Sequence, residues 1–227
     1  MSQLALPLRL ADHAVFASFL GDGNQTLVAT LMDVADGVAE TGCWLWGTAA
    51  TGKTHLLQAT CERAGDRSVY IPLASFADAS PALLEGLASR ELVCLDDLDT
   101  VAGRDDWERA LFELCNAILD VGGRLVIAAS AAPRSSHIVL PDLVSRLSRL
   151  PVFQLTPLDE AERAAALQLR ARHRGLDLPD ETARYLLSRS RRDMTSLYNL
   201  LDRLDDEALR AQRRLTIPFV KAVIEAD

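Results

Sequence analysis

The sequence contains few cysteines, and they are not grouped as metal or redox motifs require. Among its 227 residues there are four, at Cys43, Cys61, Cys94 and Cys115. No two of them form a Cys-x-x-Cys pair, and no histidine pair stands nearby at the spacing of zinc ligands. Cys43 and Cys94 fall in apolar runs that are typical of buried strands. We therefore expect reduced, buried thiols, which are usual in a cytosolic protein.

Excess positive charge is missing too. The formal net charge is −8 and the isoelectric point is about 5.0. Proteins that bind DNA broadly and without sequence preference depend on basic surface, so this balance argues against that class. It is compatible with a nucleotide site, because backbone N–H groups and a single lysine suffice to hold phosphates.

Long apolar runs are absent as well. The N-terminus lacks a basic stretch followed by a long apolar run, so no signal peptide is evident, and no run is long enough to span a bilayer. We therefore expect a cytoplasmic protein with no membrane partner. Hydrophobic residues make up 49% of the chain, which is enough for a sizeable core in one medium domain or in a domain with a small lid.

The sequence is organised around the stretch Cys43–Thr54. An apolar run at its start predicts a buried strand, a Gly-x-x-x-x-Gly-Lys-Thr loop follows, and residues 55–64 predict a helix. A phosphate-binding P-loop requires this order, because the glycines let backbone N–H groups surround phosphate and the helix start adds its positive dipole end. A Gly/Thr-rich surface turn that matches by chance is the alternative. The residues expected to bind nucleotide are Gly47, Thr48, Ala49, Ala50, Thr51, Gly52, Lys53, Thr54 and His55. Lys53 would reach the outer phosphates, and the Thr54 hydroxyl would ligate Mg²⁺.

Polar residues follow two further apolar runs. Residues 92–95 precede Asp96 and Asp97, and residues 124–129 precede Ser130. Because ligands bind at the carboxyl edge of open parallel sheets, we expect these side chains near the P-loop. Asp96 is predicted to hold Mg²⁺ through water, and Asp97 to orient or deprotonate an attacking water. A solvated turn is the alternative for the acidic pair. For Ser130, a γ-phosphate contact and an ordinary strand-end serine are equally open.

The remaining pattern predicts an α/β fold with a five-stranded parallel sheet flanked by helices, followed by a small all-α lid. We divide the chain into an N-terminal peptide (1–10), an α/β domain (11–157) and a lid (158–227). The other strands are expected at 69–73, at a sheet edge because of Pro72, and at 151–155. The other helices are expected at 26–39 after a cap at Asn24, from Pro81 to about 88, at 105–121, from the capping box Asp159-x-x-Glu162 to about 174, and at 180–188, 193–206 and 216–224.

Two features remain open from pattern alone. The N-terminal tail has three leucines in six residues, at Leu4, Leu6 and Leu8. It would form either an edge strand or an extended peptide that docks into a partner's apolar pocket. Arg146 stands just before the last predicted strand, and Arg192 at the start of a lid helix. A phosphoryl transition state needs cations, which an arginine from a neighbouring subunit can supply, although most arginines are simply solvated.

Together these motifs resemble the AAA+ ATPase superfamily, and within it the DnaA initiator branch. The similar segments are Phe16-x-x-Phe19-x-x-x-x-Asn24 for the adenine-side entry motif, Gly47–Thr54 for Walker A, Leu92–Asp97 for Walker B, Ser130 for sensor 1, Ser145-Arg146-Leu147 for the arginine-finger box, and Arg192-Asp193-Met194 for sensor 2. The resemblance implies that Phe19 and Arg192 also contact the nucleotide, ADP or ATP with Mg²⁺.

The end of the chain narrows this resemblance. The sequence stops at Asp227, without the helix-turn-helix domain of an initiator, and Gln3–Leu8 is similar to a peptide that docks on the replicative sliding clamp. This combination resembles the Hda family of DnaA-related regulators. It implies a negative regulator of replication initiation that binds the clamp, the β subunit of DNA polymerase III, through Gln3, Leu4, Leu6, Pro7 and Leu8.

The same resemblance implies how the regulator acts. Arg146 would stimulate ATP hydrolysis by ATP-bound DnaA, and the chain itself would have weak or no ATPase activity. DNA would be contacted only through the clamp, the protein would associate with the nucleoid and replisome, and homodimers or larger homo-oligomers are possible. Two other hypotheses remain: a self-contained ATPase similar to a helicase loader, and a nucleotide-binding adaptor without catalytic input.

Overall fold

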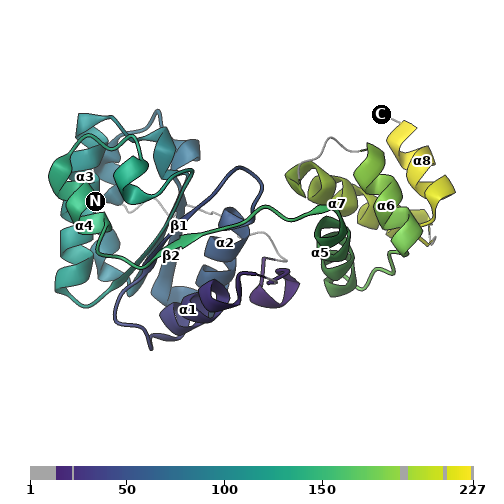
Figure 1. Cartoon of the computed structure of the whole chain (residues 1–227), viewed down its shortest axis with the longest axis horizontal. Helices are drawn as coiled ribbons and strands as arrows, with labels where there is room; N and C mark the ends of the chain where they lie inside the picture. The colour runs from purple at the N-terminus through teal and green to yellow at the C-terminus, as the bar shows by residue number, and fades with distance from the viewer. Residues whose placement is uncertain (1–13, 22, 190–193, 212–213, 226–227) are drawn as a thin grey trace. The chain divides into compact units, whose positions relative to one another are not determined.

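The structure, a computed structural model, describes residues 14–21, 23–189, 194–211 and 214–225. The chain divides into two compact units (Figure 1). Of the described residues, the α/β unit contains 14–16 and those between 21 and 156. The helical unit contains 17–20 and the described residues from Pro157 onward. The N-terminal peptide lies outside the described residues.

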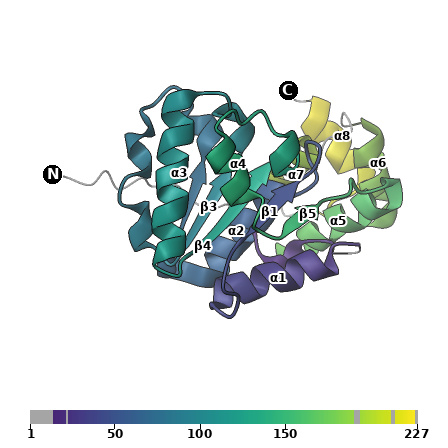
Figure 2. The same ribbon diagram turned by 60° about the vertical axis from the view of Figure 1, so that its left-hand side comes forward.

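Five parallel strands form the sheet of the α/β unit, in the order β2-β3-β4-β1-β5 (Figure 2). This confirms the predicted fold class. The strands are β1 (Cys43–Trp46), β2 (Ser68–Pro72), β3 (Leu92–Asp96), β4 (Arg124–Ala129) and β5 (Val152–Gln154). The central strands β3 and β4 are buried along their whole length, which explains their continuous apolar sequence. β2 lies at a sheet edge and ends at Pro72, as the missing proline N–H predicts.

Helices cover both faces of this sheet. They are α1 (Gln25–Asp36), α2 (Lys53–Ala64), α3 (Asp105–Asp120) and α4 (Pro141–Leu147). One face carries α3 and α4 over a core that includes the fully buried Trp44 and Trp107. The other face carries α2, with α1 packed beside it, so the two helix pairs lie on opposite sides of the strands in Figure 1. The phosphate loop and α2 are thereby fixed against the sheet.

Two helices end earlier than the sequence pattern predicts. Leu27, Leu31 and other apolar residues of α1 are buried as expected, but the helix stops at Asp36. Gly37 takes the left-handed conformation with φ 80° and caps it, so Val38 falls outside the helix and is 73% exposed. Val121, expected on the apolar stripe of α3, is instead its C-cap and is 70% exposed.

The helix predicted from Pro81 to about Ala88 is wrong. Two 3₁₀ turns replace it, Pro81–Leu84 and Leu87–Ser89. Ser80 caps the first turn, and its side chain accepts a hydrogen bond from the N–H of Ala82. Gly86 separates the turns because its φ of 78° cannot continue a right-handed helix.

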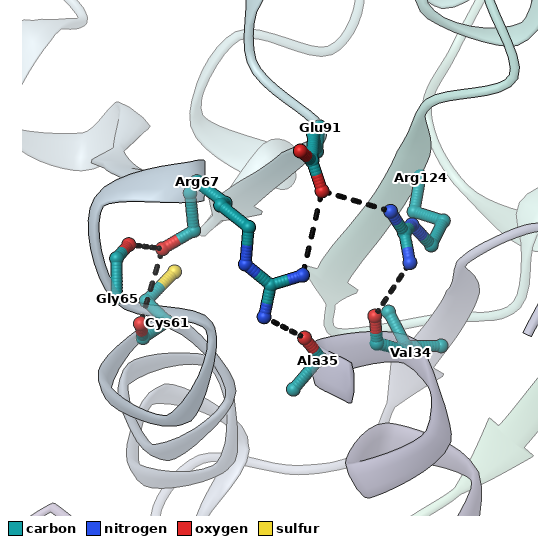
Figure 3. A network of polar contacts seen from close by, with 8 residues as sticks. Val34, Ala35, Cys61, Gly65, Arg67, Glu91 and Arg124 are labelled. Carbon is teal, nitrogen blue, oxygen red and sulfur yellow. Dashed lines mark hydrogen bonds and ion pairs between the residues drawn. The ribbon is translucent and has the colours of Figure 1, made fainter. Parts of the chain in front are cut away.

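Polar contacts tie α1 to the amino-terminal end of the sheet (Figure 3). Glu91 Oε2 accepts hydrogen bonds from Arg67 Nη1 and Arg124 Nη2, each at 3.4 Å. Arg67 Nη2 also donates to the carbonyl of Ala35 at 3.0 Å, and Arg124 Nη1 donates to that of Val34 at 3.4 Å. Both carbonyls belong to the last turn of α1, where cations complement the helix dipole. This network therefore anchors α1 to the amino-terminal end of the sheet, which is the end opposite the phosphate loop.

The helical unit contains α5 (Glu160–His173), α6 (Asp180–Arg189), α7 (Met194–Ala211) and α8 (Ile217–Glu225) around its own apolar core. The predicted capping box is confirmed: Asp159 Oδ1 accepts from the N–H of Glu162 at 2.8 Å, and Glu162 Oε2 accepts from the N–H of Asp159 at 2.7 Å. Arg170, mostly buried, lies 4.3 Å from the ring centroid of Tyr198 and joins α5 to α7.

The four cysteines are free and buried, as expected. Burial raises the pKa of Cys43 and of Cys115 to about 12. Within the described residues, the helices include none with both the length and the apolar character needed to cross a membrane.

Close backbone packing at Gly42 gives a first prediction. A Cβ added there would lie 1.8 Å from the carbonyl oxygen of Leu125. Because that neighbour is backbone within the sheet and cannot move aside, Gly42→Ala should lower the free energy of unfolding by about 3 kcal/mol. Urea unfolding followed by circular dichroism measures this loss. Gly21→Ala is the control, since a Cβ there comes no closer than 4.0 Å to Val28 and should change stability little.

Candidate nucleotide-binding site

The loop between β1 and α2 is folded tightly at its two glycines. A Cβ on Gly47 would come within 2.7 Å of the carbonyl oxygen of Leu155, and Gly52 has φ 95°. Ala50 also adopts a left-handed conformation, with φ 61°, which is uncommon for a residue other than glycine. Such turns direct successive N–H groups to one side of the loop, which is the geometry that binds anions.

Lys53 is held against the loop itself. Its Nζ donates to the carbonyl oxygens of Gly47 at 2.7 Å and Thr48 at 2.8 Å. Burial lowers the pKa of Lys53, whereas the nearby carboxylates of Asp96 and Asp97 act to raise it. The ammonium group therefore stands between the loop and the acids, where phosphate oxygens can replace the two carbonyls as its partners.

The hydroxyl groups of the loop have different surroundings. Thr51 is buried, and its Oγ1 donates to the carbonyl of Thr48 at 3.0 Å, which makes it a structural part of the turn. Thr54 lies in the first turn of α2 and is exposed, so its hydroxyl is accessible to a metal ion. His55 Nε2 lies 2.9 Å from the carbonyl oxygen of Val15, so this ring is held against the segment before the first 3₁₀ turn.

Asp96 ends β3 and is 1% exposed. The phenol of Tyr70, on the neighbouring strand β2, donates to Asp96 Oδ2 at 2.8 Å. The N–H of Asp97 donates to Asp96 Oδ1 at 3.0 Å. Burial and the negative charge of Asp96 raise the pKa of Tyr70, so this phenol keeps its proton and remains a donor. The carboxylate expected to hold a metal is thus oriented on both of its oxygens.

Asp97 is exposed and carries backbone strain. Its φ is 55°, in the left-handed region. Partial desolvation raises its pKa, and the charge of Asp96 acts in the same direction, while Lys53 opposes them. A carboxyl group with a raised pKa beside a phosphate loop has the property expected of a general base.

Ser130 follows β4 at the same edge of the sheet, next to the end of β3. Both its N–H and its hydroxyl donate to Asp99, at 2.6 Å and 2.8 Å. In this arrangement the hydroxyl is directed to a carboxylate, and it would have to leave Asp99 to meet a γ-phosphate. Asp99 is consequently a third acid at this edge, beside Asp96 and Asp97.

Arg146 lies on α4, with 26% of its side chain exposed. Its Nε donates to Oδ1 of Asn116 at 2.7 Å, and its Nη2 lies 3.9 Å from Oδ1 of Asp120. Both partners belong to α3. The start of α4 is fixed separately, because the buried carboxylate of Glu108 accepts hydrogen bonds from the N–H groups of Val139 and Leu140.

The other predicted site residues stay predictions. Phe19 belongs to the segment 17–20, which groups with the helical unit. Arg192 lies outside the described residues, as do Gln3, Leu4, Leu6, Pro7 and Leu8.

Several residues with a role in the geometry escaped sequence reasoning: Tyr70, Asp99, Glu108 and Asn116. Their contacts join positions 26 to 32 residues apart in the sequence. Spacing could have flagged only Asp99, because it closely follows the acidic pair. In the sequence, Tyr70 looks like an ordinary strand residue, and Glu108 and Asn116 look like ordinary residues of an amphipathic helix.

The described residues fit a nucleotide with Mg²⁺. The loop presents backbone N–H groups and a lysine, and Thr54 with Asp96 supplies the hard oxygen donors that Mg²⁺ prefers. Among the described residues, no group of three or more His, Cys, Asp or Glu side chains is arranged to hold a metal by itself. A magnesium ion here would accordingly share its coordination with phosphate oxygens and water.

Two family models match the sequence. The model for the bacterial DnaA ATPase domain matches residues 10–150, and the model for the Hda lid domain matches residues 159–224. Together they cover both units of the structure.

Solved structures of related architecture include domain III of the replication initiation protein DnaA from Thermotoga maritima, at 21% identity, a TM-score of 0.78, and coverage of 96% of this chain and 98% of that one. AMPPCP-bound DnaA from Aquifex aeolicus matches at 23% identity and a TM-score of 0.64, over 81% of this chain and 62% of that one. The RuvB branch migration motor from Thermotoga maritima matches at 16% identity and a TM-score of 0.62, over 89% and 69%. At these identities the likeness establishes the fold.

The strain and charge at Asp97 give a second prediction. A raised pKa in the folded state means that the folded protein loses stability, relative to an uncharged variant, as the pH rises through that pKa. Asp97→Asn should therefore raise the melting temperature at pH 7, and the gain should shrink as the pH falls through the raised pKa of Asp97 towards the ordinary pKa of aspartate. Asp97→Ala should melt lower than Asp97→Asn, because alanine in the left-handed region costs about 1 kcal/mol. Thermal melts of both variants from pH 4 to pH 7.5 measure the two effects, and a flat difference between wild type and Asp97→Asn would contradict the first.

Proposed function

Because the chain belongs to the bacterial DnaA ATPase-domain family and carries a lid of the Hda type, we propose that it is a nucleotide-binding negative regulator of replication initiation that acts on ATP-bound DnaA. The observation that carries the proposal is the joint match of both models to one chain that folds as a P-loop unit with a helical lid.

The nucleotide would be ADP or ATP. Residues 47–55 supply the phosphate loop, with Lys53 moving from its carbonyl partners to the outer phosphates. Thr54 and Asp96 would hold Mg²⁺, which neutralises phosphate charge when it is bound. Tyr70 orients the Asp96 carboxylate for that contact. The proposed role of this site is mainly to switch assembly with the partner.

Stimulation of DnaA would depend on Arg146. An arginine that acts in a neighbouring nucleotide site must lie near the surface and remain cationic, and Arg146 is partly exposed on a short helix. Docked against DnaA, its guanidinium would stabilise the charge that develops on the transferred phosphoryl group, and DnaA would convert to its ADP form.

The N-terminal peptide would tether the protein to the sliding clamp. The proposed motif consists of Gln3, Leu4, Leu6, Pro7 and Leu8, and its leucines supply the apolar side chains that a peptide needs to dock into an apolar pocket on a partner. Tethering would place the regulator in the cytoplasm at the replisome, in contact with DNA through the clamp only. It would also raise the local concentration of the regulator near loaded clamps.

A self-contained ATPase is the second candidate. The intact P-loop lysine and the Asp96–Asp97 pair, with the raised pKa of Asp97, favour it. ATP turnover by the purified protein alone separates the two, since this second candidate requires rapid turnover without DnaA or clamp.

The proposed finger gives a third prediction. Arg146→Ala should reduce the stimulated rate of ATP hydrolysis by DnaA about a thousandfold, because one transition-state cation is lost. The assay contains ATP-loaded DnaA and clamp loaded on DNA, and follows phosphate release. Arg149→Ala is the matched control, since Arg149 is an exposed arginine just after α4 and should keep full stimulation. Full stimulation by Arg146→Ala would refute the finger.

The proposed tether gives a fourth prediction. Replacing Leu6 and Leu8 together by alanine should weaken retention on immobilised clamp about tenfold or more, because the apolar anchors are lost. Ser2→Ala, a change in the same tail outside the proposed motif, should leave retention unchanged. Surface plasmon resonance measures both affinities, and equal affinity of the double variant and wild type would exclude this tether.

A further inference from the structure

The inner and outer nitrogens of the Arg146 guanidinium have different partners. Its inner nitrogen, Nε, has a close partner at 2.7 Å, the neutral amide oxygen of Asn116. One outer nitrogen, Nη2, has only a distant one, the Asp120 carboxylate at 3.9 Å. Asn116 and Asp120 are four residues apart on α3, so they lie one above the other on the same face of that helix.

A close partner at the inner nitrogen and a distant one at an outer nitrogen suit an arginine that must contact phosphate. A free arginine side chain carries about 2 kcal/mol of rotamer entropy, which would be lost each time the side chain is ordered on a phosphate. A hydrogen bond at Nε restrains the guanidinium beforehand and leaves the outer N–H groups available for bidentate contact with phosphate oxygens. Because the acceptor is a neutral amide, the bond also leaves the positive charge of the group uncompensated.

Asp120 has the opposite character. Its side chain is 75% exposed, and an ion pair of this length at the surface contributes about 0–1 kcal/mol. A phosphate group carries more charge and can replace it at little cost. Asp120 can therefore serve as a counter-ion in the free protein without holding Arg146 back.

We propose that Asn116 is the positioning residue of Arg146, a neutral mount on α3 that presents the outer nitrogens of the guanidinium to a partner's nucleotide, with Asp120 as a displaceable counter-ion. The inference rests on the proposed function and adds Asn116 to it. Both the shape of the Asn116 side chain and its lack of charge matter for this role. An acidic side chain at position 116 would make a strong ion pair and compete with the phosphate, whereas loss of the acceptor would leave the guanidinium unrestrained.

Four variants test this inference: Asn116→Asp, Asn116→Ala, Asp120→Asn and Arg146→Ala. Each is titrated against ATP-loaded DnaA and DNA-loaded clamp, so that the maximal hydrolysis rate and the concentration for half-maximal stimulation are obtained separately. Asn116→Asp keeps the size and the acceptor but adds charge, and Asn116→Ala removes the acceptor. Both should lower the maximal rate about tenfold, with the half-maximal concentration within about twofold of wild type. Asp120→Asn, one turn away, should leave the maximal rate unchanged or higher.

A second measurement uses the protein alone. The Nε–H of Arg146, assigned by its absence in Arg146→Ala, should give a signal in ¹⁵N NMR that is protected from exchange in wild type and in Asp120→Asn. It should lose that protection in Asn116→Ala. A role of Asn116 in general stability would not change the exchange protection of this Nε–H selectively. Thermal melts of the same samples report any such role.

The outcomes separate the two proposals. If Arg146→Ala abolishes stimulation but both Asn116 variants keep the wild-type maximal rate, the positioning role is overturned and the finger stands. If Asp120→Asn lowers the rate as much as Asn116→Asp does, the distinction between neutral mount and counter-ion is wrong. If Arg146→Ala itself stimulates fully, the proposed function fails and this inference fails with it.

Discussion

The pairing of β4 with both β1 and β3 is the constraint on which the phosphate site depends. The loop of Gly47 follows β1, the acids follow β3, and Ser130 follows β4, so parallel pairing brings all three to one edge of the sheet. No local turn could do this, because the three segments are separated by helices and 3₁₀ turns. Packing of these buried strands fixes their register, because a slip of one residue would turn every side chain to the opposite face of the sheet, away from the neighbours that it packs against.

Charge is distributed unevenly over the α/β unit. The negative charges of Asp96, Asp97 and Asp99 all act to raise the pKa of Lys53 at the candidate nucleotide site, against the effect of burial. Arg146 instead lies on α4 and has its contacts with α3. A protein that hydrolyses its own nucleotide needs both the carboxylates and the arginine at one site. A protein that stimulates hydrolysis by a partner needs its arginine at the surface that meets the partner. In this unit the acids lie at its own candidate nucleotide site, whereas the proposed function assigns Arg146 to the nucleotide site of a partner.

The sequence allowed the strands, the phosphate loop and the capping box of α5 to be predicted, because each depends on residues close together in the chain. The ends of the helices were harder to predict. Gly37 and Gly86 stop helical turns by adopting left-handed conformations, which the neighbouring residues in the sequence do not indicate. Tyr70 and Asn116 could not have been found, because their partners lie 26 and 30 residues away and only the fold brings them together. The placement of Ser130 at the sheet edge was predictable, but its engagement with Asp99 was not.

The distribution of the cysteines gives the molecule a built-in reporter. All four thiols are buried in the α/β unit, and the helical unit has none. Alkylating reagents react with the thiolate in water, so a buried thiol must first become accessible to solvent. The rate of alkylation would consequently follow the opening of the α/β unit alone, with or without nucleotide, whatever the lid does. A lid that unfolded first would be silent in such an experiment, so the cooperativity of the two units could be read from a single chemical signal.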